Sequence, residues 1–330
     1  MLRVGIVGAG TMGRTHAAAY TTLPNTQLVG FFDADHAFAQ RVTPQFGAKA
    51  VDSYDKLLQE VDMVDICTPT PTHLDLVLRA ASAGKHILCE KPLGRTLEQC
   101  EQMIEATTKA GVTLMPAQVL RFFPEFKQAR DLVLAGAVGK PAAIRTRRGG
   151  PYPRAANDWY ADFEQSGGPI LDMVIHDFDW LRWTFGEVER VYAKALTFKN
   201  LDHIDYALIT LRLQSGAIAH VEANWADPSG FKVDFEIAGD AGMIAFDSRF
   251  AMPLFVAKSD AGGGGGGVAV PESPLAEDPY MLEIQHFVDS VEAGKQPSIT
   301  AEDGMKAVEI ALAAIESART GKVIRLGGGA

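Results

Sequence analysis

The first 120 residues alternate short apolar runs with amphipathic stretches, and this alternation constrains the fold more than any other feature. Near-continuous hydrophobic runs are typical of strands buried on both faces of a parallel sheet. The runs lie at residues 2–7, 27–32, 63–67, 86–89 and 112–115. The stretches between them predict helices at residues 14–22, 34–46, 72–83 and 96–110, the last opening with the capping pair Thr96 and Gln99. The predicted fold class is α/β, with a doubly wound parallel sheet at the N-terminus.

After residue 120 the pattern changes to a second, α+β type. Helices are predicted at residues 124–135 and 170–185, and a strand at residues 142–146. Five further segments alternate polar and apolar residues over strand lengths, namely 188–198, 205–213, 217–225, 232–238 and 242–247. We expect a large open, mostly antiparallel sheet with the two helices on one face and the other face free for a partner subunit.

The chain is predicted to close with two helices, at residues 279–293 and 301–320. Before them, the six consecutive glycines at residues 262–267 are typical of a flexible loop tip. We therefore divide the chain into an N-terminal α/β domain, residues 1–120, and a second α+β domain, residues 121–330.

Charge and cysteine usage exclude several classes of protein. With 31 Lys and Arg against 41 Asp and Glu, the net charge of -10 offers no basic footprint for nucleic acid or an anionic membrane. Three cysteines without a Cys-x-x-Cys spacing argue against a disulfide scaffold and against a thiolate zinc site. The N-terminus shows no secretory signal, and no apolar stretch reaches the roughly 18 residues of a membrane helix. We expect a soluble, cytoplasmic protein.

A glycine-rich turn follows the first predicted strand and opens the first predicted helix. Its residues are Gly8, Ala9, Gly10, Thr11, Met12 and Gly13. In this context the backbone N–H groups at the helix N-terminus can hold a pyrophosphate. Asp33 lies 20 residues beyond Gly13, at the end of the second predicted strand, where its carboxylate can accept both hydroxyls of an adenosine ribose. The carboxylate would repel a 2′-phosphate and no arginine follows it, so NAD is preferred over NADP as cofactor.

Two more turns are predicted at the carboxyl edge of the same sheet, where ligands of open α/β folds bind. The first contains Thr68, Pro69, Thr70 and His73; the histidine either contacts the cofactor or only caps a helix or points to solvent. The second contains Glu90, Lys91 and Pro92. A fixed ammonium at Lys91 can stabilise negative charge on a substrate oxygen, although a Lys beside a Glu is usually a solvated pair.

A third group lies on the helix predicted to begin near residue 170. At about 100° per residue, Asp172, His176 and Asp179 share one face, and one turn separates Asp172 from His176. A carboxylate beside an imidazole suits proton transfer near neutral pH. The same pair could merely support the helix or form half of a metal site, but no second cluster with metal-ligand spacing is evident, and we predict no metal.

Together these motifs resemble the glucose-fructose oxidoreductase/inositol dehydrogenase/MocA (Gfo/Idh/MocA) family. The resemblance rests on the order and spacing of the glycine turn, the Thr68 to His73 turn, Glu90-Lys91-Pro92 and Gly-Gly-x-x-x-Asp-x-x-x-His at residues 167–176. It covers nearly the whole chain, including residues 280–283 and 317–322. It implies a Rossmann domain, a second domain whose open sheet forms a homodimer or homotetramer, and NAD(P)-linked hydride transfer at a carbinol or carbonyl of a sugar, cyclitol or related polyol.

The resemblance also implies roles for individual residues. Lys91, Asp172 and His176 form the catalytic group: His176 acts as general base, Asp172 orients it or binds a hydroxyl, and Lys91 stabilises the alkoxide. Further cofactor contacts are expected from Glu90, Gln118, Trp159 and Tyr280, and further substrate contacts from Arg121, Arg154 and Tyr160. Two alternatives remain: an NAD-dependent glycosidase of the same family, and a non-catalytic NAD-sensing regulator.

Overall fold

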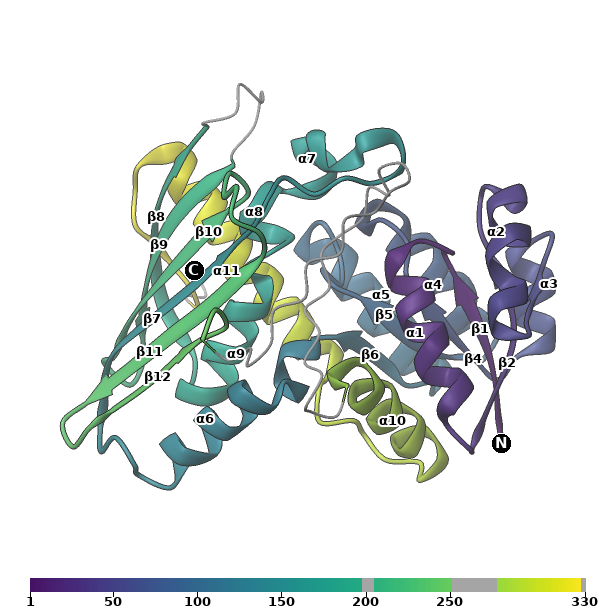
Figure 1. Ribbon diagram of the computed structural model, residues 1–330, viewed down its shortest axis with the longest axis horizontal. Helices are drawn as coiled ribbons and strands as arrows, with labels where there is room; N and C mark the ends of the chain where they lie inside the picture. The colour runs from purple at the N-terminus through teal and green to yellow at the C-terminus, as the bar shows by residue number, and fades with distance from the viewer. Residues whose placement is uncertain (198–204, 251–277, 328–330) are drawn as a thin grey trace. The chain divides into compact units, whose positions relative to one another are not determined.

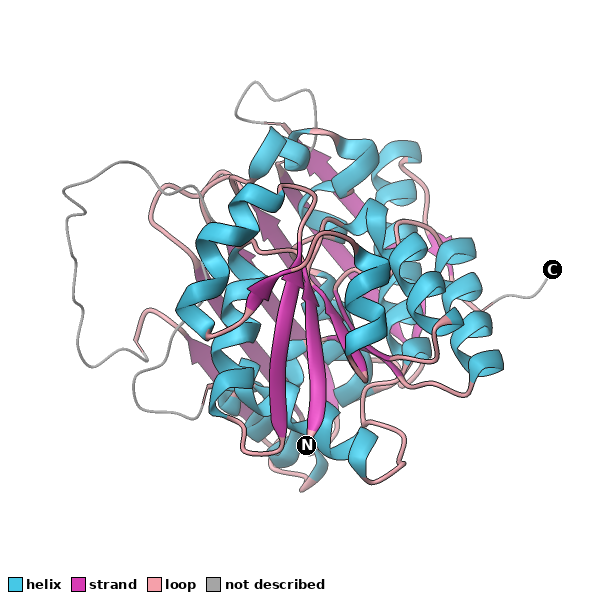
Figure 2. Ribbon diagram, turned by 90° about the vertical axis from the view of Figure 1, so that its right-hand side faces the viewer, coloured by secondary structure: helices cyan, strands magenta, loops and turns pink. Residues whose placement is uncertain are grey.

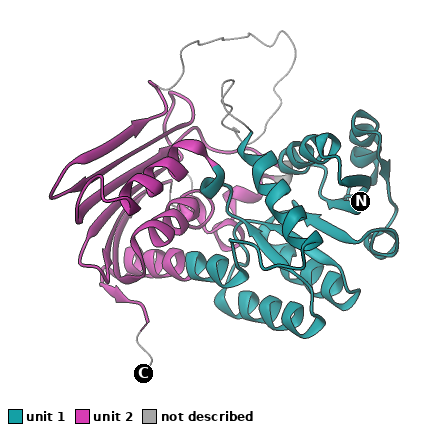
Figure 3. Ribbon diagram, turned by 90° about the horizontal axis from the view of Figure 1, so that it is seen from below, with its two compact units in different colours: residues 1–122, 277–308 teal, residues 123–276, 309–330 magenta. Residues whose placement is uncertain are grey.

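We describe residues 1–197, 205–250 and 278–327 of a computed structural model (Figure 1). The predicted loop tip at residues 262–267 and the last residue of the predicted strand 188–198 lie outside these ranges. The chain divides into two compact units, coloured in Figure 3. Unit 1 contains residues 1–122 and 277–308, and unit 2 contains residues 123–276 and 309–330. No helix among the described residues is long and apolar enough to cross a membrane.

Unit 1 is built on a parallel sheet of six strands in the order β3-β2-β1-β4-β5-β6. This is the doubly wound order predicted from the sequence, in which the crevice at the carboxyl ends of the strands binds the ligand. Figure 2 draws the strands in magenta and the helices in cyan. The strands are β1 (Leu2–Val7), β2 (Thr26–Phe32), β3 (Lys49–Ala50), β4 (Met63–Ile66), β5 (His86–Glu90) and β6 (Leu114–Ala117).

The α-helices of unit 1 match the predicted positions with one addition, α3. They are α1 (Thr11–Thr22), α2 (His36–Val42), α3 (Tyr54–Glu60), α4 (His73–Ser82), α5 (Leu97–Ala110), α10 (Pro279–Glu292) and, across the boundary of the unit, α11 (Ala301–Thr320). The two-residue β3 and the seven-residue α3 were not predicted, because both are too short to show a period. Thr96 caps α5 as expected, since its hydroxyl accepts the Gln99 N–H at 3.3 Å.

The C-terminal part of the chain returns to unit 1. Ile284, Phe287 and Val288 of α10 are fully buried in the same core as Tyr20 and Phe31. Residues 277–308 therefore pack with the first unit, which differs from the predicted second domain of residues 121–330. The apolar face of α10 is visible in the sequence, but its partner is not, because a helical period does not say which sheet buries it.

Unit 2 is built on a mixed, mostly antiparallel sheet of seven strands in the order β12-β11-β7-β10-β9-β8-β13. The only parallel pair among them joins β7 and β10. The strands are β7 (Pro141–Gly149), β8 (Val188–Leu196), β9 (Tyr206–Leu213), β10 (Ile218–Asn224), β11 (Lys232–Gly239), β12 (Met243–Asp247) and β13 (Ile324–Arg325). Each predicted strand of this sheet is present, and β13 was not predicted.

One face of this sheet is covered by α6 (Pro124–Leu134) and α9 (Ile175–Phe185), as predicted (Figure 1). Fully buried Trp180 of α9 lies 5.2 Å, centroid to centroid, from the rings of both Phe126 and Phe235. Its indole N–H also donates to the Phe126 carbonyl at 3.1 Å. On the opposite face, Leu208 and Ile218 are exposed.

The predicted helix at residues 170–185 is interrupted. The structure has a four-residue helix α8 (Gly168–Leu171), a turn at residues 172–174, and then α9. Gly167 and Gly168 both have positive φ, and the N–H groups of Met173 and Val174 both donate to the Pro169 carbonyl. Because two N–H groups share this acceptor, the regular helical hydrogen bonding stops here. Asp172 and His176 therefore do not lie on successive turns of one continuous helix.

Candidate active site

The glycine turn of unit 1 makes space at the N-terminus of α1. A side chain at Gly13 would collide with the Gly8 carbonyl oxygen, so helix and strand can approach each other only with glycine there. At Gly10, by contrast, an added Cβ would meet no protein atom within 4 Å. Gly10 is also the N-cap of α1 and supplies no side chain to cap the first N–H groups. These N–H groups and the open space above Gly10 fit the pyrophosphate of a dinucleotide.

Asp33 lies beside this turn, at the carboxyl end of β2. One carboxylate oxygen accepts the Ala9 N–H at 2.8 Å and the other accepts the Asp35 N–H at 2.8 Å. Two backbone N–H groups therefore hold the carboxylate next to the glycine turn, where the predicted ribose contact would lie.

The turn after β4 is held by a buried histidine. His73 is fully buried, with Nδ1 at 2.9 Å from the Pro92 carbonyl oxygen and Nε2 at 2.9 Å from the Thr68 carbonyl oxygen. Of the alternatives left open for His73, its burial excludes the one in which the side chain points to solvent. Both ring nitrogens contact backbone carbonyls, so the side chain lies between the Thr68 turn and the Pro92 turn. Burial lowers the pKa of His73, against the effect of the carbonyls.

Glu90 and Lys91 lie at the carboxyl end of β5. Glu90 is buried, and its Oε2 accepts the Lys91 backbone N–H at 3.0 Å. Lys91 itself is partly exposed. The pair is therefore not the solvated pair that composition alone would suggest.

The remaining predicted residues of unit 1 have different surroundings. Gln118, after β6, is fully buried, and neither of its amide atoms has a hydrogen-bond partner among the described residues. A buried amide of this kind is costly unless a ligand or water satisfies it, which favours the predicted cofactor contact. Arg121 is buried and donates to the Ser298 carbonyl at 3.1 Å, with Asp303 at 3.3 Å. Tyr280 is buried at the start of α10.

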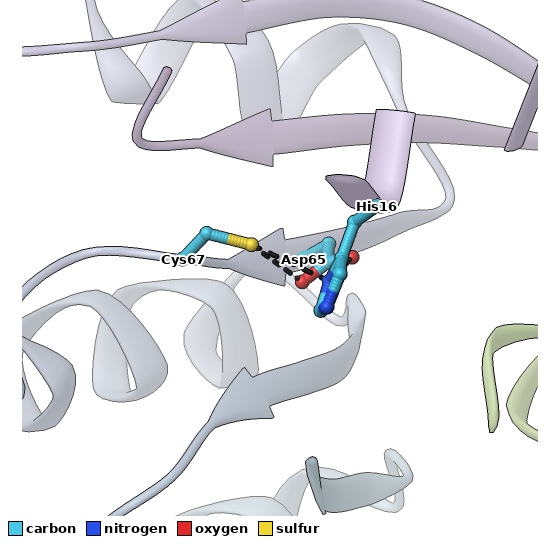
Figure 4. A group of neighbouring side chains, drawn as sticks. All are labelled: His16, Asp65 and Cys67. Atoms are coloured by element: carbon cyan, nitrogen blue, oxygen red, sulfur yellow. Dashed lines mark hydrogen bonds and ion pairs between the residues drawn. The ribbon is translucent and has the colours of Figure 1, made fainter. Parts of the chain in front are cut away.

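A polar cluster that the sequence did not single out is formed by buried His16 and Asp65 with partly buried Cys67 (Figure 4). Nδ1 of His16 on α1 is 2.9 Å from Oδ2 of Asp65 on β4, and Nε2 of His16 is 3.4 Å from Oε1 of Glu90. The Cys67 thiol donates to Asp65 Oδ1 at 3.2 Å. Burial alone would lower the pKa of His16, but Asp65 raises it well above its ordinary 6.5. The two carboxylates that face its ring nitrogens favour the charged form of the imidazole.

The donor atoms of His16, Asp65 and Cys67 lie within 4.8 Å of one another, which is close enough to hold a metal ion. Two features argue for shared protons instead. The separations of 2.9 and 3.2 Å are those of hydrogen bonds. Burial also raises the pKa of Cys67 well above 9.0, with Asp65 adding to the effect, so the sulfur stays a thiol, whereas a metal ligand is a thiolate.

In unit 2, the predicted catalytic helix is anchored from β7. Asp172 is buried, His176 is partly exposed, and Asp179 is fully buried. Asp177, next to His176, accepts a hydrogen bond from Nε of Arg148 at 2.7 Å, and both side chains are buried. Breaking a buried ion pair of this kind is strongly destabilising, so the pair holds the start of α9 on the sheet.

An aromatic group forms the other predicted part of unit 2. Trp159 and Tyr160 stack with ring centroids 4.2 Å apart, and the Tyr160 ring lies edge-on to Trp225 at 5.8 Å. Tyr160 is buried, Trp159 is partly exposed, and Arg154 is exposed.

Comparison with known proteins agrees with this architecture. The model described as "Oxidoreductase family, NAD-binding Rossmann fold" of the Gfo/Idh/MocA family matches residues 2–118, and the family's C-terminal domain model matches residues 126–245. Myo-inositol 2-dehydrogenase of Thermotoga maritima is 30% identical over 334 residues, covering 98% of both chains. scyllo-Inositol 2-dehydrogenase (NAD(+)) of Bacillus subtilis is 31% identical over 339 residues, covering 98% of this chain and 96% of its own.

A solved structure gives the same result. scyllo-Inositol dehydrogenase from Lactobacillus casei, with bound NAD(H) and scyllo-inositol, has a TM-score of 0.84 at 26% identity, covering 99% of this chain and 100% of its own.

The parallel sheet with its dinucleotide cradle defines a Rossmann-fold oxidoreductase. The chain belongs to the Gfo/Idh/MocA family, and it is an enzyme, an NAD(P)-dependent dehydrogenase that acts on CH–OH groups.

The residues that sequence reasoning missed have a recognisable signal. Asp65 is the one charged residue in the apolar run at 63–67, and a carboxylate within a strand buried on both faces needs a partner. His16 supplies that contact from the helix that the glycine turn opens. Only the three-dimensional structure identifies the pairing.

We predict that Gly10→Ala weakens NADH binding at least about 10-fold while leaving the fold intact, because the new methyl group meets no protein atom but fills the space above the turn. Binding is measured by NADH fluorescence and folding by thermal unfolding. Gly13→Ala is the matched comparison and should lower the unfolding midpoint, since its methyl group collides with the Gly8 carbonyl. Unchanged NADH affinity in folded Gly10→Ala would contradict the assignment of the cradle.

Proposed function

We propose that the protein is an NAD-dependent cyclitol dehydrogenase that oxidises an inositol-like substrate at one carbinol carbon. The observation that carries this proposal is the cradle of unit 1, in which the open space above Gly10 lies beside the held carboxylate of Asp33. The inositol dehydrogenases among the relatives, each covering nearly the whole chain, support the substrate class.

The chemistry divides between the cofactor and three side chains. The glycine turn and Asp33 would hold NAD, which would supply the hydride acceptor for oxidation of the substrate. His176 removes the proton of the substrate hydroxyl, and its partial exposure leaves it accessible. Asp172 orients the imidazole or binds a neighbouring hydroxyl, and the Lys91 ammonium stabilises the negative charge on the substrate oxygen. In the reverse direction the same groups protonate the alkoxide formed from a ketone.

Substrate contacts are proposed for Tyr160, Arg154 and Arg121 beside the catalytic group, and cofactor contacts for Gln118, Trp159 and Tyr280. The buried amide of Gln118 is the best supported of these. The substrate contact of Arg121 is the least supported, because its guanidinium already donates to the Ser298 carbonyl and contacts Asp303. The cytoplasmic location stays a prediction.

Steady-state assays with a panel of inositols and sugars test the function. We expect NADH to accumulate with a cyclitol, and Lys91→Ala and His176→Ala to lower kcat by about 10²- to 10⁴-fold. Exposed Lys109→Ala is the control and should leave kcat unchanged. Hydrolysed sugar without accumulating NADH would indicate the glycosidase, and NAD binding without turnover of any substrate would indicate the regulator. Full turnover in both catalytic variants would overturn the residue assignments.

The cofactor preference follows from Asp33. We expect wild-type kcat/KM to favour NAD over NADP and Asp33→Ala to narrow that gap, because the carboxylate both binds the ribose hydroxyls and repels a 2′-phosphate. Asp33→Asn keeps an oxygen that can accept the Ala9 N–H but removes the charge. It therefore separates the repulsion of the NADP 2′-phosphate from the effect of Asp33 on the geometry of the glycine turn. Equal wild-type kcat/KM for the two cofactors would count against this role.

We also infer that the protein forms a homodimer or homotetramer through the uncovered face of the unit 2 sheet. Leu208 is 51% exposed in the middle of this face, and Ile218 and Tyr192 are exposed on the neighbouring strands β10 and β8. Light scattering after size exclusion should give an oligomer for the wild type and a smaller species for Leu208→Arg. Leu134→Arg, at the exposed end of α6, is the control. A monomeric wild type at micromolar concentration would refute the inference.

A further inference from the structure

Two fully buried histidine rings contact the segment of Glu90, Lys91 and Pro92. One contacts the residue before the lysine and the other contacts the residue after it. His16 lies next to Glu90, and His73 lies next to Pro92. Both histidines belong to unit 1, as the whole segment does. None of the chemistry proposed above uses either ring.

The contact from His16 passes through a single carboxylate. Oε1 of Glu90 is 3.4 Å from Nε2 of His16, the distance of an ion pair rather than of a short hydrogen bond. Oε2 of the same carboxylate accepts the Lys91 backbone N–H at 3.0 Å. Glu90 therefore connects the ring on α1 to the backbone of Lys91.

The other ring nitrogen of His16 makes this contact a charged one. Nδ1 lies 2.9 Å from Asp65, so the ring stands between two carboxylates. Burial would lower the pKa of His16, yet Asp65 raises it well above 6.5. Burial would likewise raise the pKa of Glu90, yet His16, the charge of Lys91 and the Lys91 N–H lower it. Both shifts describe one imidazolium held between Asp65 and Glu90.

The other groups around the ring do not oppose this charge. Cys67 and Tyr20 have their pKa values raised, chiefly by burial, and are neutral near pH 7. From α10, the Tyr280 ring centroid lies 6.3 Å from that of His16, and the buried Glu283 acts electrostatically on Tyr20. A negative charge on Glu283 would favour the imidazolium further.

On the other side, His73 ties the backbone after Lys91 to a neighbouring turn. Nδ1 lies 2.9 Å from the Pro92 carbonyl oxygen and 3.3 Å from that of Leu93, while Nε2 lies 2.9 Å from the Thr68 carbonyl oxygen. Carbonyl oxygens only accept hydrogen bonds, and burial lowers the pKa of His73, so the neutral ring donates through one nitrogen, either to the turn after β5 or to the turn after β4. The segment is thus attached to α1 and β4 through His16 and to the start of α4 through His73.

We propose that His16 and His73 are positioning residues for Lys91: they hold the backbone on both sides of it, so that its ammonium meets the substrate oxygen in one place. The need for such support follows from the lysine side chain, a charge on a flexible four-carbon stem. A displacement of about 1 Å at a reacting group can cost about 10²-fold in rate. The proposal rests on the catalytic role proposed for Lys91.

Two substitutions of His16 separate positioning from a general loss of structure. His16→Asn can keep a donor near the Nδ1 position toward Asp65 and loses the contact with Glu90, whereas His16→Gln can keep a donor near the Nε2 position toward Glu90. We expect kcat to fall about 10- to 100-fold in His16→Asn and less in His16→Gln. The dissociation constant of NADH should stay within about threefold in both.

A second readout does not need turnover. After reductive methylation with ¹³C-formaldehyde, the dimethyl-lysine NMR signal of Lys91, assigned by its loss in Lys91→Arg, reports the surroundings of its nitrogen. We expect this signal to shift or broaden in His16→Asn and also in His73→Asn. Tyr54→Phe is the matched control, because it removes a buried hydrogen bond to the Leu76 carbonyl in the same unit and leaves residues 90–92 untouched. The control should leave the signal unchanged.

The charge on His16 has its own signature. ¹⁵N NMR of histidine-labelled protein should show both His16 nitrogens protonated at pH 7.5, above the ordinary pKa of about 6.5. The stability that this charge contributes is fully present below about pH 6.5 and is lost as pH rises through the raised pKa. The difference in unfolding free energy between wild type and His16→Gln should therefore shrink with rising pH.

The outcomes distinguish failure of the positioning proposal from failure of the proposed function. An inactive wild type with a Lys91 signal that still responds to both histidines refutes the function and not the positioning. An active wild type whose kcat and Lys91 signal are the same in His16→Asn, His73→Asn and Tyr54→Phe refutes the positioning alone. Stoichiometric zinc in the purified protein, or a neutral His16 ring at pH 7.5, would contradict the imidazolium and make the cluster a metal site or a neutral network.

Discussion

The close approach of α1 to β1 at Gly13 is the contact on which the rest of unit 1 depends. Because no side chain separates the helix from the Gly8 carbonyl, the first turn of α1 lies directly over the carboxyl edge of the sheet. This places the uncapped N–H groups of the helix beside Asp33 and, one turn later, places His16 over β4 and β5. One packing constraint thus locates both the cofactor cradle and the buried charge behind it.

That buried charge shows how the unit combines polar groups with a dry core. An unpaired carboxylate on β4 would be strongly destabilising, because burial removes its hydration. Asp65 instead faces an imidazolium, and the second nitrogen of that ring faces Glu90. The cluster lies between the strand ends that carry the predicted ligand contacts. His16, which pairs with the buried Asp65, therefore also adjoins the segment that carries Lys91.

Unit 2 also contains a buried ion pair, which holds a helix on its sheet. Its predicted catalytic residues lie on a short, interrupted helical segment, where Asp172 is the C-cap of α8 and His176 lies in the first turn of α9. The buried pair of Arg148 and Asp177 ties that second helix to β7, and the ring cluster around Trp180 fills the space beneath it. Helical periodicity predicted one continuous helix through Asp172 and His176, but it could not show the break, which depends on two N–H groups sharing the Pro169 carbonyl.

The sequence by itself determined the α/β order of unit 1, the strands of the second sheet, the glycine turn with its acid, and the three candidate catalytic residues. These features depend on local period and on spacing along the chain, which the order of residues contains. The tertiary structure alone decided that α10 packs in the first unit, that His73 is buried between two turns, and that His16 pairs with Asp65 and Glu90. Each of these contacts joins separate parts of the chain. An apolar face or a buried charge is unstable without a partner, so the sequence shows that a partner is needed, but it does not show which residue provides it.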